Sequence, residues 1–162
     1  MLIPAVHKTD YKSAQSIIKN GFDLNKFGSA TLKTGQSDRF RYHPRGVYFS
    51  TAEGFSPEDM VSHPWDHRQK GVLIFCQVRL NNPFVTEPFI EGKFYQEWLG
   101  QKYGGSGAKL TRAMENEGYD GIVCPKTSEV VVFNPSQIEI DKKKTTKSLR
   151  LHAGFKEWIS KE

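Results

Sequence analysis

The sequence is poor in cysteine and has no long apolar run. Two cysteines in 162 residues cannot build a disulfide framework or a four-cysteine zinc site. Cys76 and Cys124 each lie inside an apolar run, which indicates buried thiols in a reducing compartment. No apolar segment approaches the ~20 residues that span a bilayer, and residues 1–8 lack the apolar stretch of a secretory signal. We therefore expect a cytoplasmic domain that has no contact with a membrane.

Several motifs that would identify an enzyme class are also missing. The sequence has no Gly-x-Gly-x-x-Gly segment or phosphate-loop lysine after a strand, and no Gly-x-Ser-x-Gly nucleophile elbow. His63 and His67 have the i, i+4 spacing of helical metal ligands, but Pro64 lies between them. Because proline disrupts the helix that would point both rings at one ion, we expect no metal site.

Charge is unevenly distributed along the chain. Residues 1–140 carry 16 basic and 15 acidic side chains, whereas residues 141–162 carry 7 basic and 3 acidic ones. The size and composition fit one main domain over residues 1–140, followed by a basic extension over residues 141–162. A charge run is either a solvated face or a phosphate contact. The cations concerned are Lys142, Lys143, Lys144, Lys147 and Arg150.

Hydrophobic periodicity and turn residues predict short helices and strands in an α+β fold. A helix is expected from Thr9 or Asp10 to Asn20, and a second one carries Leu110 and Met114 and ends at Gly118. A further helical patch is expected near 153–159. Residues 27–45 read as a long surface loop, and residues 84–107 have no assignable pattern. The expected strands are 46–50, 71–80, 121–124, 129–133 and 136–140.

Three polar residues lie next to or within apolar strand segments. His7 follows the apolar residues 2–6, Tyr48 lies inside a strand, and Glu129 precedes Val130-Val131-Val132-Phe133. A carboxylate at the mouth of a buried strand costs several kcal/mol unless it is paired or in contact with water at a cleft. Taken singly, each of these residues also has an ordinary structural interpretation.

Taken together, the segments around these residues resemble a known family. His7-Lys8-Thr9 resembles the H-G-[ST] motif, and Arg45-Gly46-Val47-Tyr48-Phe49-Ser50 resembles the G-[IV]-Y-F segment, of ADP-ribosyltransferases of the poly(ADP-ribose) polymerase and diphtheria-toxin type. The segment from Ser128 to Ile138 is similar to their N-E-Y-x-V-[YF] strand, and the 71–80 run matches an intervening strand. The resemblance covers about residues 5–140 in the family order.

The resemblance implies an ADP-ribosyltransferase-like split mixed β-sheet core with a few short helices around an NAD cleft. It also implies roles for the three polar residues. Glu129 would hydrogen-bond the nicotinamide-ribose 2′-hydroxyl, and Tyr48 would stack on the nicotinamide ring. His7 would contact the adenosine-ribose 2′-hydroxyl.

Further NAD contacts follow from the matched segments and from the loop before residue 46. The family holds the carboxamide through the backbone of the residue after the histidine, which is Lys8 here instead of glycine. A stacking aromatic is expected where the sequence has Asp59, and Phe55 is the nearest substitute. The resulting NAD-binding set is Lys8, Thr9, Arg39, Arg41, Arg45, Phe49, Ser50, Phe55 and Ser56.

The sequence therefore predicts an NAD-dependent mono-ADP-ribosyltransferase, with NAD as a co-substrate. The basic extension and the arginine and aromatic content favour RNA or DNA over protein as the acceptor. Two alternatives stay open: a non-catalytic ADP-ribose or nucleic-acid binding module on the same fold, and an NAD glycohydrolase with water as the acceptor.

Overall fold

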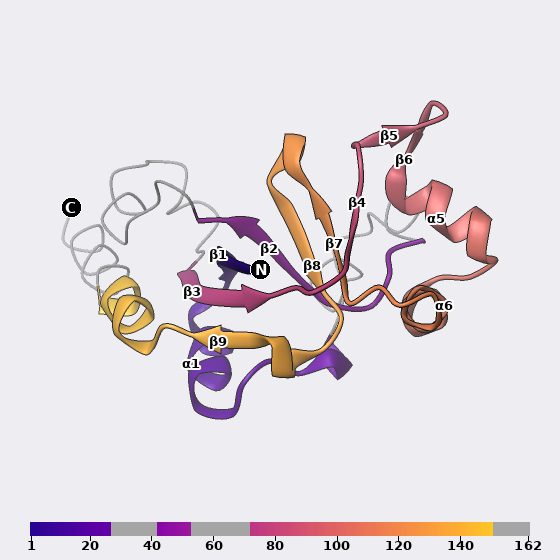
Figure 1. Ribbon diagram of the computed structural model, residues 1–162. Coiled ribbons are helices and arrows are strands. Elements are labelled where there is room, and N and C mark those ends of the chain that lie inside the picture. The colour runs from indigo at the N-terminus through magenta and orange to yellow at the C-terminus, as the bar shows by residue number, and fades with distance from the viewer. Residues whose placement is uncertain (27–41, 53–71, 151–162) are drawn as a thin grey trace, which may run out of the picture. The chain divides into compact units, whose positions relative to one another are not determined.

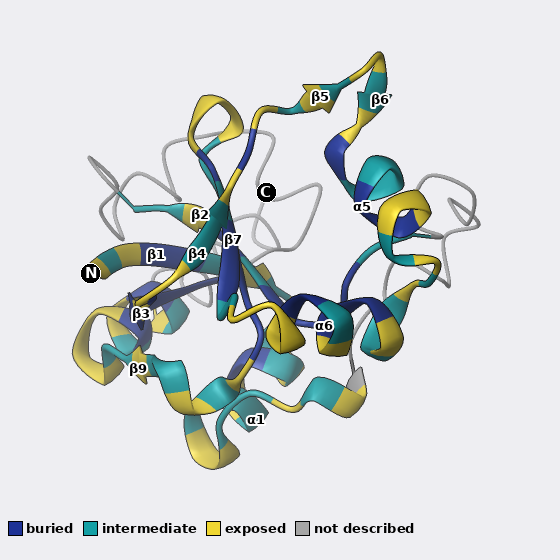
Figure 2. Cartoon of the chain, turned by 45° about the vertical axis from the view of Figure 1, so that its right-hand side comes forward, coloured by how far each residue is buried: buried dark blue, intermediate teal, exposed yellow. Residues whose placement is uncertain are grey.

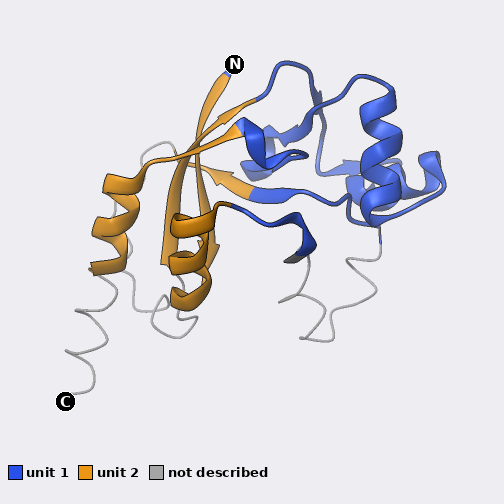
Figure 3. Cartoon of the chain, turned by 90° about the horizontal axis from the view of Figure 1, so that it is seen from below, with its two compact units in different colours: residues 1, 22–48, 80–137 blue, residues 2–21, 49–79, 138–162 orange. Residues whose placement is uncertain are grey.

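A computed structural model describes residues 1–26, 42–52 and 72–150 of the chain. Their helices and strands form a mixed α+β fold, as the sequence predicts. The chain divides into two compact units (Figure 3). Unit 1 contains residue 1 and residues 22–48 and 80–137, and unit 2 contains residues 2–21, 49–79 and 138–162.

An antiparallel ladder forms the core of unit 2. The strand order is β2-β1-β3-β9, with only residues 49–51 of β2 belonging to this unit, and Figure 1 labels each strand. β1 pairs with β3 along its whole length, from Leu2 opposite Arg79 to Thr9 opposite Val72. Six of the eight residues of β3 are apolar and buried, and only Gln77 and Arg79 are exposed, which confirms the strand predicted over 71–80. The strand bounds are Leu2–Thr9 for β1, Val47–Thr51 for β2, Val72–Arg79 for β3 and Ile138–Ile140 for β9.

Helix α1 (Tyr11–Asn20) has the two ends that the sequence predicts. The Asp10 carboxylate accepts a hydrogen bond from the Ser13 backbone N–H at 2.7 Å. Gly21 follows the helix with φ +82°, and its N–H donates to the Ile17 carbonyl at 2.7 Å. The side chain of Ala14 is fully buried, so the helix covers the sheet with the face that carries Ala14.

A further helix occupies residues 142–150. Asp141 begins it, since its Oδ1 accepts from the Lys144 N–H at 3.0 Å. The Phe75 N–H of β3 donates to Thr145 Oγ1 at 3.0 Å, and the Asp141 N–H donates to the Phe75 carbonyl at 2.7 Å. The predicted basic extension thus includes a helix that is hydrogen-bonded to β3. The helical patch predicted over 153–159 lies outside the described residues.

Unit 1 contains both parallel and antiparallel strand pairs. β4 (Pro83–Val85) runs parallel to β7 (Gly121–Cys124), and β7 runs antiparallel to β8 (Glu129–Val132). A parallel pair needs a long crossover, and here it contains the hairpin of β5 (Phe89–Ile90) and β6 (Lys93–Phe94) and two helices. The helices are α5 (Tyr95–Tyr103) and α6 (Gly107–Asn116). Short 3₁₀ turns cover Leu24–Lys26, Pro125–Thr127 and Pro135–Gln137.

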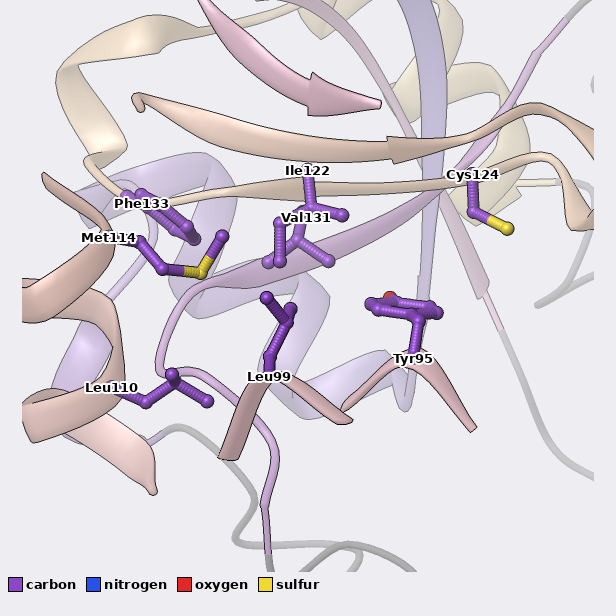
Figure 4. Packing of buried hydrophobic residues seen from close by; sticks show 8 residues of the cluster. All are labelled: Tyr95, Leu99, Leu110, Met114, Ile122, Cys124, Val131 and Phe133. Carbon is purple, nitrogen blue, oxygen red and sulfur yellow. The ribbon is translucent and has the colours of Figure 1, made fainter. Parts of the chain in front are cut away.

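The hydrophobic core of unit 1 lies between the two helices and the strands β7 and β8. Figure 4 shows side chains from both kinds of element in one cluster. The members are Tyr95, Leu99, Leu110, Met114, Ile122, Cys124, Val131 and Phe133. Buried residues are concentrated in strands such as β7, and exposed residues in the turns (Figure 2).

Both cysteine thiols are buried and free, as expected from the apolar runs around them. The described ranges contain no helix that combines the length and the apolar character needed to cross a bilayer.

Gly121 tests the packing of β7, because a Cβ built there would lie 2.5 Å from the Val131 carbonyl oxygen and 2.6 Å from Leu80 Cδ2. Neither the backbone oxygen nor a buried leucine can yield easily. We expect Gly121→Ala to lower the free energy of unfolding by about 2–3 kcal/mol, measured by urea denaturation. Gly105→Ala is the control, since the three atoms nearest to its Cβ would all belong to the flexible Lys109 side chain. Equal stability losses in both variants would contradict this packing.

Candidate functional site

Glu129 lies at the mouth of a buried strand. A 3₁₀ turn ends at Thr127, Ser128 adopts φ +59°, and Glu129 then pairs with Cys124 as the first residue of β8. The next three residues, Val130–Val132, are fully buried, whereas Glu129 is half-buried. A carboxylate at this boundary is unfavourable without hydrogen bonds. The hydrogen-bond partners of the Glu129 carboxylate therefore determine its orientation.

Two side chains at the start of α5 hold this carboxylate. The Tyr95 hydroxyl donates a hydrogen bond to Glu129 Oε1, and Gln96 Nε2 donates to the same oxygen at 3.4 Å. The Tyr95 side chain is only 3% exposed, so its hydroxyl is fixed by the core around its ring. Within the described part of the chain no donor reaches the second oxygen, Oε2. The carboxylate is thus oriented through one oxygen, and a ligand can hydrogen-bond the other.

Burial and the charge of Glu129 raise the pKa of both nearby tyrosines. Desolvation raises the pKa of Tyr95, and the Glu129 charge and its hydrogen bond raise this pKa further. The pKa of Tyr48 is also raised, first by burial and then by the charge of Glu129. A phenol is protonated at neutral pH even at its ordinary pKa of about 10, and both shifts move deprotonation further from neutral pH.

Tyr48 lies in β2 and belongs to the same unit as Glu129. Its hydroxyl donates to the Pro44 carbonyl at 2.6 Å, and its ring packs against the core cluster of unit 1. The sequence-predicted pair of Tyr48 and Glu129 is thus brought close enough for the Glu129 charge to raise the pKa of Tyr48.

A hollow of about 320 Å³ lies beside the carboxylate. This volume is at the lower end of the range for small-molecule sites, about 300–1,000 Å³. Aromatic rings form much of its wall, and Phe89 and Phe94 at its edge are 59% and 41% exposed with ring centroids 4.9 Å apart. The lining residues are His43, Pro88, Phe89, Phe94, Tyr95, Gln96, Thr127 and Glu129. Such a wall suits a flat ring attached to a hydroxyl-bearing group.

His43 connects the hollow with Tyr48. Its ring lines the hollow and lies 5.3 Å from the Tyr48 ring, centroid to centroid, at an interplanar angle of 43°. Tyr48 itself is not among the described lining residues. Burial lowers the pKa of His43 from 6.5 to about 4, so the imidazole is neutral at pH 7. His43 therefore adds a polar ring without adding a positive charge.

The N-terminal part of the predicted site belongs to unit 2. His7 is half-buried in β1, opposite Ile74 of β3, and its ring lies 5.7 Å edge-on from the Phe49 ring. Phe49 is buried, and Ser50 is exposed and pairs with Val6. Lys8 and Thr9 follow His7 on the same strand, exposed and half-buried respectively. The convergence of His7 with Tyr48 and Glu129 stays a prediction.

Arg45 is held by its backbone in unit 1. Its N–H donates to the Gly107 carbonyl at 3.1 Å, and its carbonyl accepts from Thr111 Oγ1 at 2.7 Å. The Arg45 Nε atom is buried and has no hydrogen-bond partner among the described residues. The remaining predicted NAD contacts, Arg39, Arg41, Phe55 and Ser56, lie outside the described residues. Asp59 also lies outside them.

Sequence reasoning did not assign roles to Tyr95, Gln96, Phe89 and Phe94. All four lie in the stretch 84–107, whose aromatics show no helical or strand period. The Tyr95–Glu129 bond joins residues 34 positions apart, so no local pattern could have indicated it. The one available signal was the density of aromatic residues just before a predicted helix.

No metal centre is evident in the described ranges, where no three His, Cys, Asp or Glu side chains are grouped to hold an ion. The polar groups that the described residues bring to the hollow are one carboxylate, one amide, one phenol, one threonine hydroxyl and one neutral imidazole. This set can orient a neutral or cationic ligand by hydrogen bonds and ring contacts.

His43 gives a pH-dependent prediction. Its folded-state pKa of about 4 lies below the usual 6.5, so the stability that it contributes is present above pH 6.5 and is lost as pH falls toward 4. Over that interval we expect the wild type to lose about 1–3 kcal/mol more unfolding free energy than His43→Phe, after a discount for partial exposure. Urea denaturation at several pH values measures this difference. Parallel curves for the two proteins would show that His43 titrates normally.

Comparison of the chain with models of protein families and with curated protein sequences finds no match. The functional conclusion therefore depends on the residues and geometry described above.

Proposed function

We propose that the chain is an NAD-dependent mono-ADP-ribosyltransferase with an ADP-ribosyltransferase-like sheet. The observation that carries the proposal is the Glu129 carboxylate, which is held through Oε1 beside an aromatic-lined hollow. The Glu129 segment is also one of the motifs that resemble the family. The mixed ladder of unit 1 and the antiparallel ladder of unit 2 fit the α+β class to which the family fold belongs.

The proposed reaction breaks the bond between the ribose C1′ and the nicotinamide nitrogen of NAD. The electron pair of this bond stays on nicotinamide, which leaves as a neutral ring. Positive charge develops on the ribose, as in glycoside hydrolysis. A nucleophilic atom of the acceptor then forms a bond to C1′ and releases its proton to solvent. The products are ADP-ribosylated acceptor, nicotinamide and one proton.

Glu129 would stabilise this transition state more than the ground state. In the proposal, Oε2 accepts a hydrogen bond from the 2′-hydroxyl of the nicotinamide ribose. Because the ribose becomes positive as the bond breaks, a carboxylate at this position binds it more tightly in the transition state. Tyr95 and Gln96 hold the other oxygen, so the carboxylate need not reorient during the reaction.

The aromatic side chains would bind the flat nicotinamide ring. Tyr48 has this role in the family pattern, and the neutral His43 ring, which lines the hollow, lies 5.3 Å from the Tyr48 ring, centroid to centroid. A neutral imidazole suits this place, since a protonated one would repel the cationic nicotinamide ring of NAD. His7, Lys8 and Thr9 are proposed to bind the adenosine ribose and the carboxamide, and the buried Arg45 Nε is a candidate donor.

The proposal predicts that Glu129→Gln lowers ADP-ribose transfer by about 100-fold or more, because the amide carries no negative charge to stabilise the oxocarbenium-like ribose. Labelled NAD is incubated separately with cell protein, RNA and DNA, and incorporated label is measured. Glu117→Gln is the matched control: Glu117 also accepts from a tyrosine hydroxyl, that of Tyr103 at 2.5 Å, but at an exposed position.

The proposal would be wrong if Glu129→Gln transferred label as fast as the wild type. Release of nicotinamide with only free ADP-ribose as the second product would identify an NAD glycohydrolase. Binding of ADP-ribose without nicotinamide release would identify a non-catalytic module.

Tyr95→Phe tests the proposed positioning of Glu129. The variant keeps the buried ring but loses the hydrogen bond to Oε1, so we expect kcat to fall about 10- to 100-fold with little change in KM for NAD. Tyr103→Phe removes the equivalent bond to Glu117 and should leave both constants unchanged. A rise in KM at constant kcat would indicate a binding role for Tyr95 and would contradict the positioning role.

A further inference from the structure

The helix over residues 142–150 carries the whole net charge of the protein. It contains five of the 23 lysines and arginines and no aspartate or glutamate. The rest of the chain has 18 basic and 18 acidic side chains and is therefore neutral at pH 7 with neutral histidines. Such a concentration of charge of one sign in nine residues distinguishes this helix from the other described helices.

The cations lie on the side of the helix that faces away from the sheet. Thr145 and Ser148 are 0% and 3% exposed, and Thr145 is hydrogen-bonded to β3, so these two residues mark the inner face. Lys143, Lys147 and Arg150 follow an i, i+4, i+7 spacing, which places them in one stripe on the opposite side. All five basic side chains of the helix are exposed.

This stripe is unlike an ordinary solvated helix face. Solvated helices usually alternate acidic and basic residues at i, i+4, and these pairs stabilise the helix. Here Lys143 and Lys147 are like charges at i, i+4, and Lys147 and Arg150 are like charges at i, i+3, so the helix itself contains no acidic residue at these spacings. The hydrogen bonds of Asp141 and Thr145 hold this charged helix on β3. A bound polyanion would bring negative charge to the stripe.

We propose that this basic stripe, with Lys142 and Lys144 at its sides, binds the phosphodiester backbone of a nucleic acid. From residue 143 to 150 a helix rises about 10 Å. Along a duplex one strand presents a phosphate about every 3.4 Å, so about three phosphates lie within that length. Lysine and arginine bind phosphate oxygens without reading the bases, so the contact is independent of sequence.

The composition of the helix argues against a membrane surface as the partner. Helices that lie in a membrane interface combine their cations with an apolar face of Trp, Phe or Leu that enters the lipid. The buried residues of this helix are the hydroxyl-bearing Thr145 and Ser148, and its one large apolar residue, Leu149, is half-buried. The exposed positions 142, 143, 144, 147 and 150 are all Lys or Arg. Charge is thus the main attraction that the helix offers.

Binding of nucleic acid by the stripe does not depend on the proposed enzyme activity. A role of the stripe in holding the acceptor rests on the proposed transferase function, and the acceptor would then be a nucleic acid. Binding without NAD and transfer with NAD can be measured separately, so a failure of one is distinguishable from a failure of the other.

The test compares two triple variants of the full chain that change net charge equally. One is Lys143→Gln, Lys147→Gln, Arg150→Gln. The control is Lys102→Gln, Lys109→Gln, Arg112→Gln, which removes two exposed lysines and one exposed arginine from α5 and α6. Binding of a short fluorescent single-stranded RNA, a duplex DNA and vesicles of phosphatidylcholine with phosphatidylserine is measured without NAD, from about 50 mM to about 200 mM salt.

We expect the helix variant to raise Kd for both nucleic acids at least about tenfold, and to reduce the slope of log K against log salt by about 2 to 3. The control should retain most of the wild-type affinity and slope. Equal losses in the two variants would overturn the proposal, as would wild-type binding to the vesicles alone or to none of the probes. Circular dichroism and thermal unfolding verify that both variants fold.

Discussion

The hydrogen bond from Tyr95 to Glu129 is the interaction on which the candidate site depends. β8 is buried from Val130 onward. Glu129, its first residue, is therefore the only position of the strand at which a carboxylate can still reach a hollow. The core of unit 1 fixes the Tyr95 ring, and the ring fixes the carboxylate. The Glu129 carboxylate, which would be unfavourable at this depth without hydrogen bonds, is thereby held in one orientation.

Local signals predicted much of the fold. Asp10 and Gly21 delimit α1 because capping depends on residues within one turn of the helix end. β3 and β8 followed from apolar, β-branched runs. The hairpin strands β5 and β6 are two residues long, too short for alternation to be recognised, and the parallel β4–β7 pairing depends on contacts far apart in sequence. The helix over 142–150 was missed because its inner face is formed by Thr145 and Ser148, which give no apolar period.

The residues of the candidate site likewise fall into those that a local motif indicated and those that depend on tertiary contacts. Glu129 and Tyr48 were found from motifs, because each has a recognisable neighbourhood in the chain. Tyr95 and Gln96, which orient Glu129, act across the fold and have no motif of their own. The neutral state of His43 likewise follows from burial, which depends on tertiary packing and not on neighbouring residues.

The most direct test of the central claim is carbon NMR of the side-chain carboxylates with a non-hydrolysable NAD analogue. The account predicts that the Glu129 carboxyl resonance shifts on saturation with the analogue, together with ring signals of Tyr95 and His43, while the Glu117 carboxyl stays unchanged. Saturable binding that leaves Glu129 unmoved, with shifts confined to other residues, would contradict the account, as would the absence of any binding.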